Sequence, residues 1–201
     1  GGPRLSGTKD FALKTVKPVA NGFVAELESV QPAFSAVLTA TAAPEGLRLG
    51  LNVINAGQQP TDFKVSFPHL SGLAVSAQPA DDYYFFPSGG GIINHVPALI
   101  RRGYGDHEAL YQVMDLYSPS LGCGVSVRAD DAEGWHKILA LRKYLLGQGT
   151  ANEAKTWSDM RVRSEYRWLN SLDAEVEGTS LAYDYLRRTR APGAGFQPAS
   201  A

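Results

Sequence analysis

Alternation of apolar and polar residues over short segments constrains the fold of this chain more than any other feature. Between 47 and 53 every second residue is a leucine or valine, and Arg48 and Asn52 occupy intervening positions. Similar alternation occurs in four more segments: 11–17, 23–28, 34–41 and 63–67, the last ended by Pro68. Short strands about ten residues apart with Gly and Pro between them are typical of antiparallel sandwiches and barrels. We therefore predict an all-β chain, built as a two-sheet antiparallel β-sandwich.

The second half of the chain is less regular. In the segment 135–146, the spacing of Leu139 and Leu141 is that of a strand, whereas the spacing of Ile138 and Leu141 is that of a helix. Because the neighbouring segments are predicted strands, we favour a strand here as well. We also predict strands at 111–117, 124–128, 174–177 and 181–186, with a turn at Gly178-Thr179, and leave 161–168 open.

Charge and length exclude several classes of protein. The 19 Lys and Arg nearly balance 20 Asp and Glu. The chain therefore lacks the excess of positive charge that binding to nucleic acid or to an anionic membrane requires. An apolar fraction of 44% is too high for a disordered chain. The 201 residues predict one β-sandwich domain over 1–190, followed by a Gly- and Pro-rich linker over 191–201 that leads toward a further domain.

The sequence contains none of the strong catalytic or cofactor motifs. The histidines lack metal-ligand spacing, so we expect no metal and no cofactor, and we expect surface or loop positions for His69, His95, His107 and His136. Asp81-Asp82 and Asp130-Asp131 lie beside turn signals and are expected to cap turns or face solvent. Cys123 lies in an apolar stretch and is expected to be a small buried side chain.

The densest feature is four consecutive aromatic residues, 83–86, followed by Gly89-Gly90-Gly91. In a strand two of the four rings enter the core and two face outward. An exposed ring beside a flexible glycine loop suits stacking against the C–H face of a sugar. Packing between sheets is the alternative for these rings.

A second Gly-rich segment, 101–108, combines arginines, a ring, a carboxylate and an imidazole, and we predict it to be a loop. Pairing of its Arg and Asp side chains to order the loop is the alternative to a binding role. The candidate carbohydrate-binding residues from the two segments are Tyr83, Tyr84, Tyr104, Asp106 and His107.

Several segments carry a resemblance to a known family: 55–60, 65–73, 83–91, 112–119 and 122–131. Together they resemble the β-supersandwich domain that precedes the (β/α)8 catalytic barrel in many predicted bacterial glycoside hydrolases. The resemblance implies a galactose mutarotase-like fold, with two large antiparallel sheets packed face to face.

The resemblance also implies a role. The chain would be a non-catalytic accessory domain of a polysaccharide-degrading enzyme, located outside the cell or in the periplasm, with a glycan and the barrel of the same parent chain as its partners. The catalytic carboxylates would then lie in that barrel. Two alternatives stay open: a free-standing carbohydrate-binding module, and a mutarotase-like epimerase or lyase that pairs His95, His107 or His136 with an acid.

Overall fold

The computed structural model describes residues 9–29, 33–104, 108–131, 136–145 and 178–197, without the side chains of 186–189. These residues form antiparallel strands and one short 3-10 helix, which confirms the all-β prediction. Within them, no helix is long and apolar enough to cross a lipid bilayer. Where the sequence predicted one domain, the chain divides into two compact units, 1–65 with 186–201, and 66–185. Two long strands, β5 (Thr61–Leu73) and β12 (Gly178–Arg190), each contribute residues to both units.

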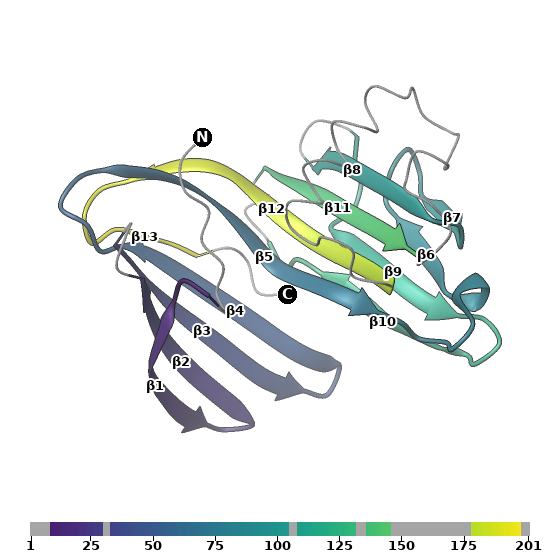
Figure 1. Ribbon diagram of the computed structural model, residues 1–201, viewed down its shortest axis with the longest axis horizontal. Coiled ribbons are helices and arrows are strands. Elements are labelled where there is room, and N and C mark those ends of the chain that lie inside the picture. The colour runs from purple at the N-terminus through teal and green to yellow at the C-terminus, as the bar shows by residue number, and fades with distance from the viewer. Residues whose placement is uncertain (1–8, 30–32, 105–107, 132–135, 146–177, 198–201) are drawn as a thin grey trace. The chain divides into compact units, whose positions relative to one another are not determined.

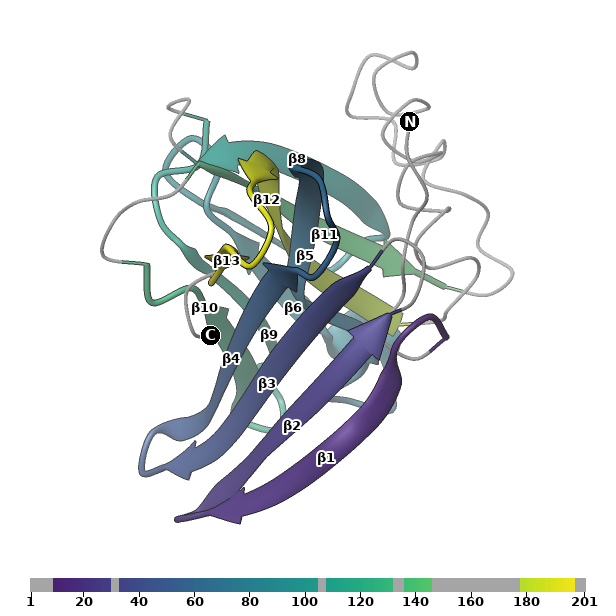
Figure 2. The same ribbon diagram turned by 90° about the vertical axis from the view of Figure 1, so that its left-hand side faces the viewer.

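The first unit contains a five-stranded sheet in the order β1-β2-β3-β4-β13. Its strands are β1 (Ala12–Val19), β2 (Gly22–Ser29), β3 (Phe34–Ala43), β4 (Gly46–Asn55) and β13 (Gly195–Phe196). The first four follow one another as hairpins (Figure 2). A tight turn at Ala20 and Asn21 joins β1 to β2, and Asn21 adopts the left-handed conformation, with a φ of 60°.

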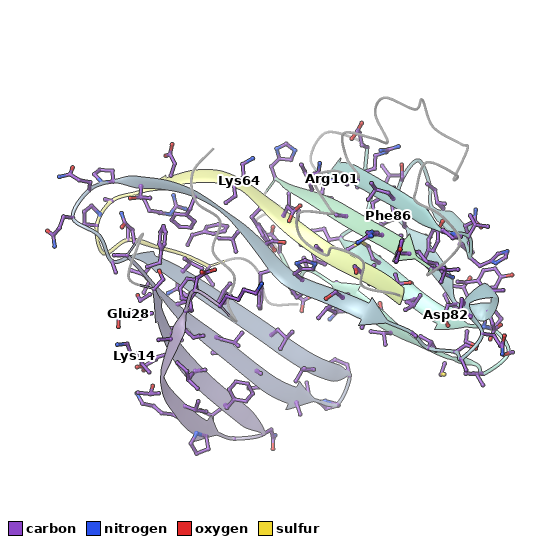
Figure 3. All side chains as sticks on the ribbon, in the orientation of Figure 1. Lys14, Glu28, Lys64, Asp82, Phe86 and Arg101 are labelled. Carbon is purple, nitrogen blue, oxygen red and sulfur yellow. The ribbon has the colours of Figure 1, made fainter. Side chains whose placement is uncertain are left out.

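The two faces of this sheet differ in polarity. Cross-strand register places Phe34, Ala36 and Ala40 on one face, and all three are buried. The opposite face carries exposed ion pairs between β1 and β2, Lys14 with Glu28 at 2.6 Å and Lys17 with Glu26 at 2.9 Å (Figure 3 labels the first pair). This is the pattern that the period-2 alternation predicts.

Part of the predicted linker belongs to this sheet. Gly195 and Phe196 pair with Ile54 and Val53 of β4, and Phe196 is 4% exposed. The guanidinium of Arg190 lies 5.5 Å from the ring of Phe196, and its Nε donates to the carbonyl of Gly195. Backbone pairing with β4 and one buried ring together hold part of a stretch whose composition predicts a linker.

The second unit is a sandwich of two four-stranded sheets, β10-β9-β6-β7 and β5-β12-β11-β8 (Figure 1). The additional elements are η1 (Pro79–Asp81), β6 (Tyr83–Phe86), β7 (Ile92–Asn94), β8 (Ala98–Tyr104), β9 (Val113–Ser118), β10 (Cys123–Arg128) and β11 (Lys137–Tyr144). Strand β11 confirms the strand interpretation of 135–146, whereas 161–168 and 174–177 lie outside the described residues.

The inner faces of these two sheets form an apolar core. Leu139, Leu141 and Met114 are each 0% exposed, and Phe86 points into the same interior (Figure 3). The hydroxyl of Tyr183 on β12 donates to the carbonyls of Val127 at 2.7 Å and Gln112 at 3.0 Å, which ties one sheet to the other. The antiparallel two-sheet sandwich predicted from the sequence is thus the architecture of this unit.

Three predicted boundaries are wrong. Strand β5 continues through Pro68, which an edge strand tolerates because one side of its backbone has no ladder to complete. Residues 101–104 are not a loop but the end of β8, paired with β11. Gly178-Thr179 is not a turn but the start of β12, where Tyr144 pairs with Gly178.

The predicted burial of Cys123 is also wrong, since its side chain is exposed. The cysteine opens β10, which is an edge strand, and Val127 is the one buried residue of that strand. An apolar sequence does not show whether a strand is central or at an edge.

Candidate functional site

The four consecutive aromatic residues alternate as predicted. Tyr84 and Phe86 are 2% and 0% exposed and face the core, while Tyr83 and Phe85 are half-buried on the opposite face of β6. Burial raises the pKa of Tyr84 to about 12 because the phenolate would lose its hydration. Tyr84 is therefore a core residue, and its ring is not placed to stack against a sugar.

Tyr83 belongs to a row of three rings that crosses three strands. Its centroid lies 5.9 Å from that of Tyr117 on β9 and 4.9 Å from that of His95, which directly follows β7. The planes of the two pairs are tilted by 31° and 36°. All three side chains are half-buried. We call Tyr117, Tyr83 and His95 the aromatic row.

A glycine is paired with the residue at one end of the aromatic row. Gly124 of β10 pairs with Tyr117. A Cβ at this position would lie 2.7 Å from the Cβ of Tyr117 and 2.6 Å from the carbonyl oxygen of Leu116, so the two strands approach too closely for any other residue. The cross-strand partner of Tyr117 therefore contributes no side chain beside its ring.

In the glycine run after β6, Gly91 packs against Phe85, whereas a Cβ added at Gly89 or Gly90 would meet nothing within 4 Å. At Gly91, where φ is +114°, an added Cβ would lie 2.6 Å from Cε2 of the Phe85 ring. The loop is thus shaped to receive that ring, which lies beside Tyr83 on the same face of β6.

Two carboxylates lie near the aromatic row. Asp81 accepts hydrogen bonds from the hydroxyls of Ser118 and Ser120, and these bonds lower the pKa of Asp81. Asp115 lies two residues from Tyr117 on the same face of β9, and its buried Oδ1 has no hydrogen-bond partner among the described residues. Asp82 instead accepts from the backbone N–H groups of Val75 and Ser76, which confirms its predicted turn-capping role.

The aromatic row is anchored from behind by a buried lysine. The ammonium group of Lys143 on β11 donates to the carbonyls of Pro79 at 2.6 Å, Asp82 at 2.6 Å and His95 at 2.7 Å. One residue thus holds the segments that lead into Tyr83 and His95. Burial lowers the pKa of Lys143, and the carboxylate of Asp82 opposes that shift.

The second candidate segment lies elsewhere in this unit. Tyr104 ends β8, and its ring centroid is 4.8 Å from the ammonium group of Lys137. Lys137 is 0% exposed and lies 2.5 Å from both Asp131 Oδ2 and Gln112 Oε1. Asp106 and His107 lie outside the described residues. The structure therefore places Tyr104 in a buried polar cluster, not in the aromatic row.

This cluster corrects the prediction for Asp131. The side chain of Asp131 is 2% exposed because it is the partner of a buried ammonium group, whereas its neighbour Asp130 is exposed and pairs with Arg128 at 2.9 Å. Burial lowers the pKa of Lys137, and the hydrogen bond and charge of Asp131 oppose that shift.

Sequence reasoning missed Tyr117 and Lys143. Tyr117 was recognised only as part of a strand, and the alternation of half-buried Val113, Asp115 and Tyr117 with buried residues was the signal for its outward face. Lys143 has no signal of this kind, because its three acceptors are backbone groups distant in the chain.

The histidines His69, His95 and His136 are half-buried. In the described parts of the chain no group of three or more His, Cys, Asp or Glu side chains is arranged to hold a metal ion.

Comparison with known proteins finds a likeness of structure. No family model matches the chain, and no curated protein matches its sequence. Over 95% of its length the chain is similar to 69% of a galactose mutarotase related enzyme from Lactobacillus acidophilus, with a TM-score of 0.46 and 10% sequence identity.

Proposed function

We propose that this chain is a non-catalytic carbohydrate-binding β-sandwich that serves as an accessory domain of a glycoside hydrolase. The aromatic row contacts the glycan, and the sandwich supports the catalytic barrel of the same parent chain.

The observation that carries the binding role is the row of half-buried rings on the outer face of a sheet. Tyr117, Tyr83 and His95 are spaced by about one strand separation, so they offer a continuous aromatic surface. The C–H face of a pyranose packs on such a surface, while its hydroxyls need polar partners at the rim. Asp81, whose carboxylate accepts from the hydroxyls of Ser118 and Ser120, supplies an acceptor beside the aromatic row.

The accessory role is supported by the sequence resemblance to domains that precede a catalytic barrel. The test is turnover by the isolated chain on a panel of polysaccharides. Release of reducing sugar by this chain alone would contradict a non-catalytic role, and it would favour the lyase alternative, because only cleavage of the glycosidic bond frees a reducing end.

The binding role is tested by titrating neutral oligosaccharides into the chain and into Tyr83→Ala and Tyr117→Ala variants by calorimetry. We expect millimolar affinity, near −4 kcal/mol, and at least tenfold weaker binding in either variant. Tyr111→Ala is the matched control, because Tyr111 is a 54% exposed tyrosine outside the aromatic row. Circular dichroism verifies that each variant is folded, and unchanged affinity in folded Tyr83→Ala and Tyr117→Ala would refute the proposal.

A further inference from the structure

We propose that the aromatic row selects neutral glycans and rejects anionic ones, such as polymers of uronic acids, because aspartates bracket it on both sides. This inference rests on the proposed carbohydrate-binding function and names the chemical class of its ligand.

The bracketing follows from the register of β6 and β9. Tyr83 pairs with Tyr117 and Phe85 pairs with Asp115, so Asp115 lies on one side of the aromatic row. Asp81 ends η1, just before β6, and its carboxylate accepts hydrogen bonds from Ser118 and Ser120. Ser118 ends β9 directly after Tyr117, so these bonds hold Asp81 on the other side of the aromatic row.

Among the described residues of the sheet that carries the aromatic row, cations that could neutralise these carboxylates are scarce. The sequence has no Lys or Arg between Lys64 and Arg101, and none between Glu108 and Val127. Strands β6, β7, β9 and β10 are fully described and contain one such residue, Arg128, whose Nε lies 2.9 Å from Asp130. Lys143 directs its ammonium group to three backbone carbonyls.

Asp81 keeps its negative charge at mildly acidic pH. Hydrogen bonds from Ser118 and Ser120 hold the pKa of Asp81 below its usual range, so the group stays ionised at the mildly acidic pH where free carboxylates begin to protonate. The Oδ1 atom of Asp115 is buried, so this aspartate acts on a ligand at the surface through its negative charge.

The experiment compares a neutral oligosaccharide that binds with an oligogalacturonate of equal length, at about 20 mM and about 500 mM salt. The variants are Asp81→Asn and Asp115→Asn, which remove charge but retain hydrogen-bonding capacity. The control is Glu28→Gln, which removes the same charge from an exposed site on the five-stranded sheet.

We expect the unaltered chain to bind the uronate at least tenfold more weakly than the neutral glycan at low salt, and the gap to narrow at high salt. Each Asp→Asn variant raises the uronate affinity by about three- to tenfold, whereas Glu28→Gln leaves it unchanged. Equal binding of both glycans by the unaltered chain, or Asp→Asn variants that behave like Glu28→Gln, overturns the selectivity alone. Binding of neither glycan overturns the proposed function as well.

Discussion

The two units of this protein differ in the exposure of their ion-paired side chains. On the five-stranded sheet, ion pairs such as Lys17 with Glu26 are exposed, with 65% and 44% of their side-chain surfaces open to solvent. In the sandwich, Lys137 and Asp131 form a pair whose side chains are 0% and 2% exposed. Lys143 in the same sandwich is 3% exposed and is satisfied by backbone carbonyls.

The difference shows that residue type does not determine the role of a charge. An exposed pair forms in competition with water and contributes little, because both partners are well hydrated when apart. A buried pair has lost that hydration, so each partner depends on the other. In the sandwich, buried ammonium groups lie near both ends of β11. Lys137 and Lys143 each contact groups outside their own sheet.

The largest effect is expected from Lys137→Met. This variant leaves the Asp131 carboxylate buried without its partner, so the free energy of unfolding should fall by about 3–5 kcal/mol. Urea denaturation followed by circular dichroism measures the change. The double variant Lys137→Met with Asp131→Leu should recover most of the loss, because replacing both ions removes the uncompensated charge. A loss below about 1 kcal/mol in the single variant would show that the pair is not buried in solution.

A smaller effect is expected from the ionisation of Tyr84. Its pKa is about 12 in the folded state against about 10 in an unfolded chain, so the folded state holds this proton more tightly. The associated stability is fully present below pH 10 and is lost as the pH rises from about 10 to 12, by about 1–2 kcal/mol.

The measurement is the free energy of unfolding between pH 9 and 12 for the unaltered chain and for Tyr84→Phe. The comparison between the two isolates Tyr84 from other groups, since burial also raises the pKa of Tyr183. Tyr84→Phe should show a shallower alkaline decline. Parallel curves would mean that Tyr84 is accessible to solvent.

The smallest effect is expected from Lys17→Ala on the five-stranded sheet. Because the Lys17–Glu26 pair is exposed, its removal should cost less than about 1 kcal/mol, and about 1 M salt should abolish the difference. Denaturation at low and high salt tests this. If Lys17→Ala lowered the free energy of unfolding as much as Lys137→Met, and still did so at high salt, the predicted difference between exposed and buried ion pairs would be contradicted.

Much of the fold is predictable from the sequence where one face of a strand is buried. Alternation locates β2, β3 and β4, since residues such as Leu27, Leu38 and Val53 face the same side of the sheet. Prediction fails where tertiary position decides. Pro68 continues a strand because β5 is an edge, and Phe196 orders a linker-like segment because β4 offers it a partner.

The candidate site is only partly predictable for the same reason. The alternation of 83–86 identifies Tyr83 as outward and Tyr84 as inward, once a strand is assumed. That Tyr117 and His95 lie beside Tyr83 depends on the pairing of β6 with β9 and β7, which no local pattern encodes. Tyr104 was selected for its neighbours in sequence, but its spatial neighbour is the buried Lys137.

The central claim is that a glycan binds on the aromatic row, and mapping by two-dimensional NMR tests it most directly. A neutral oligosaccharide should shift the amide signals of β6, β9 and the segment around His95, and leave those of β1 and β2 unchanged. Shifts confined to residues outside the aromatic row and its flanking aspartates would contradict the claim.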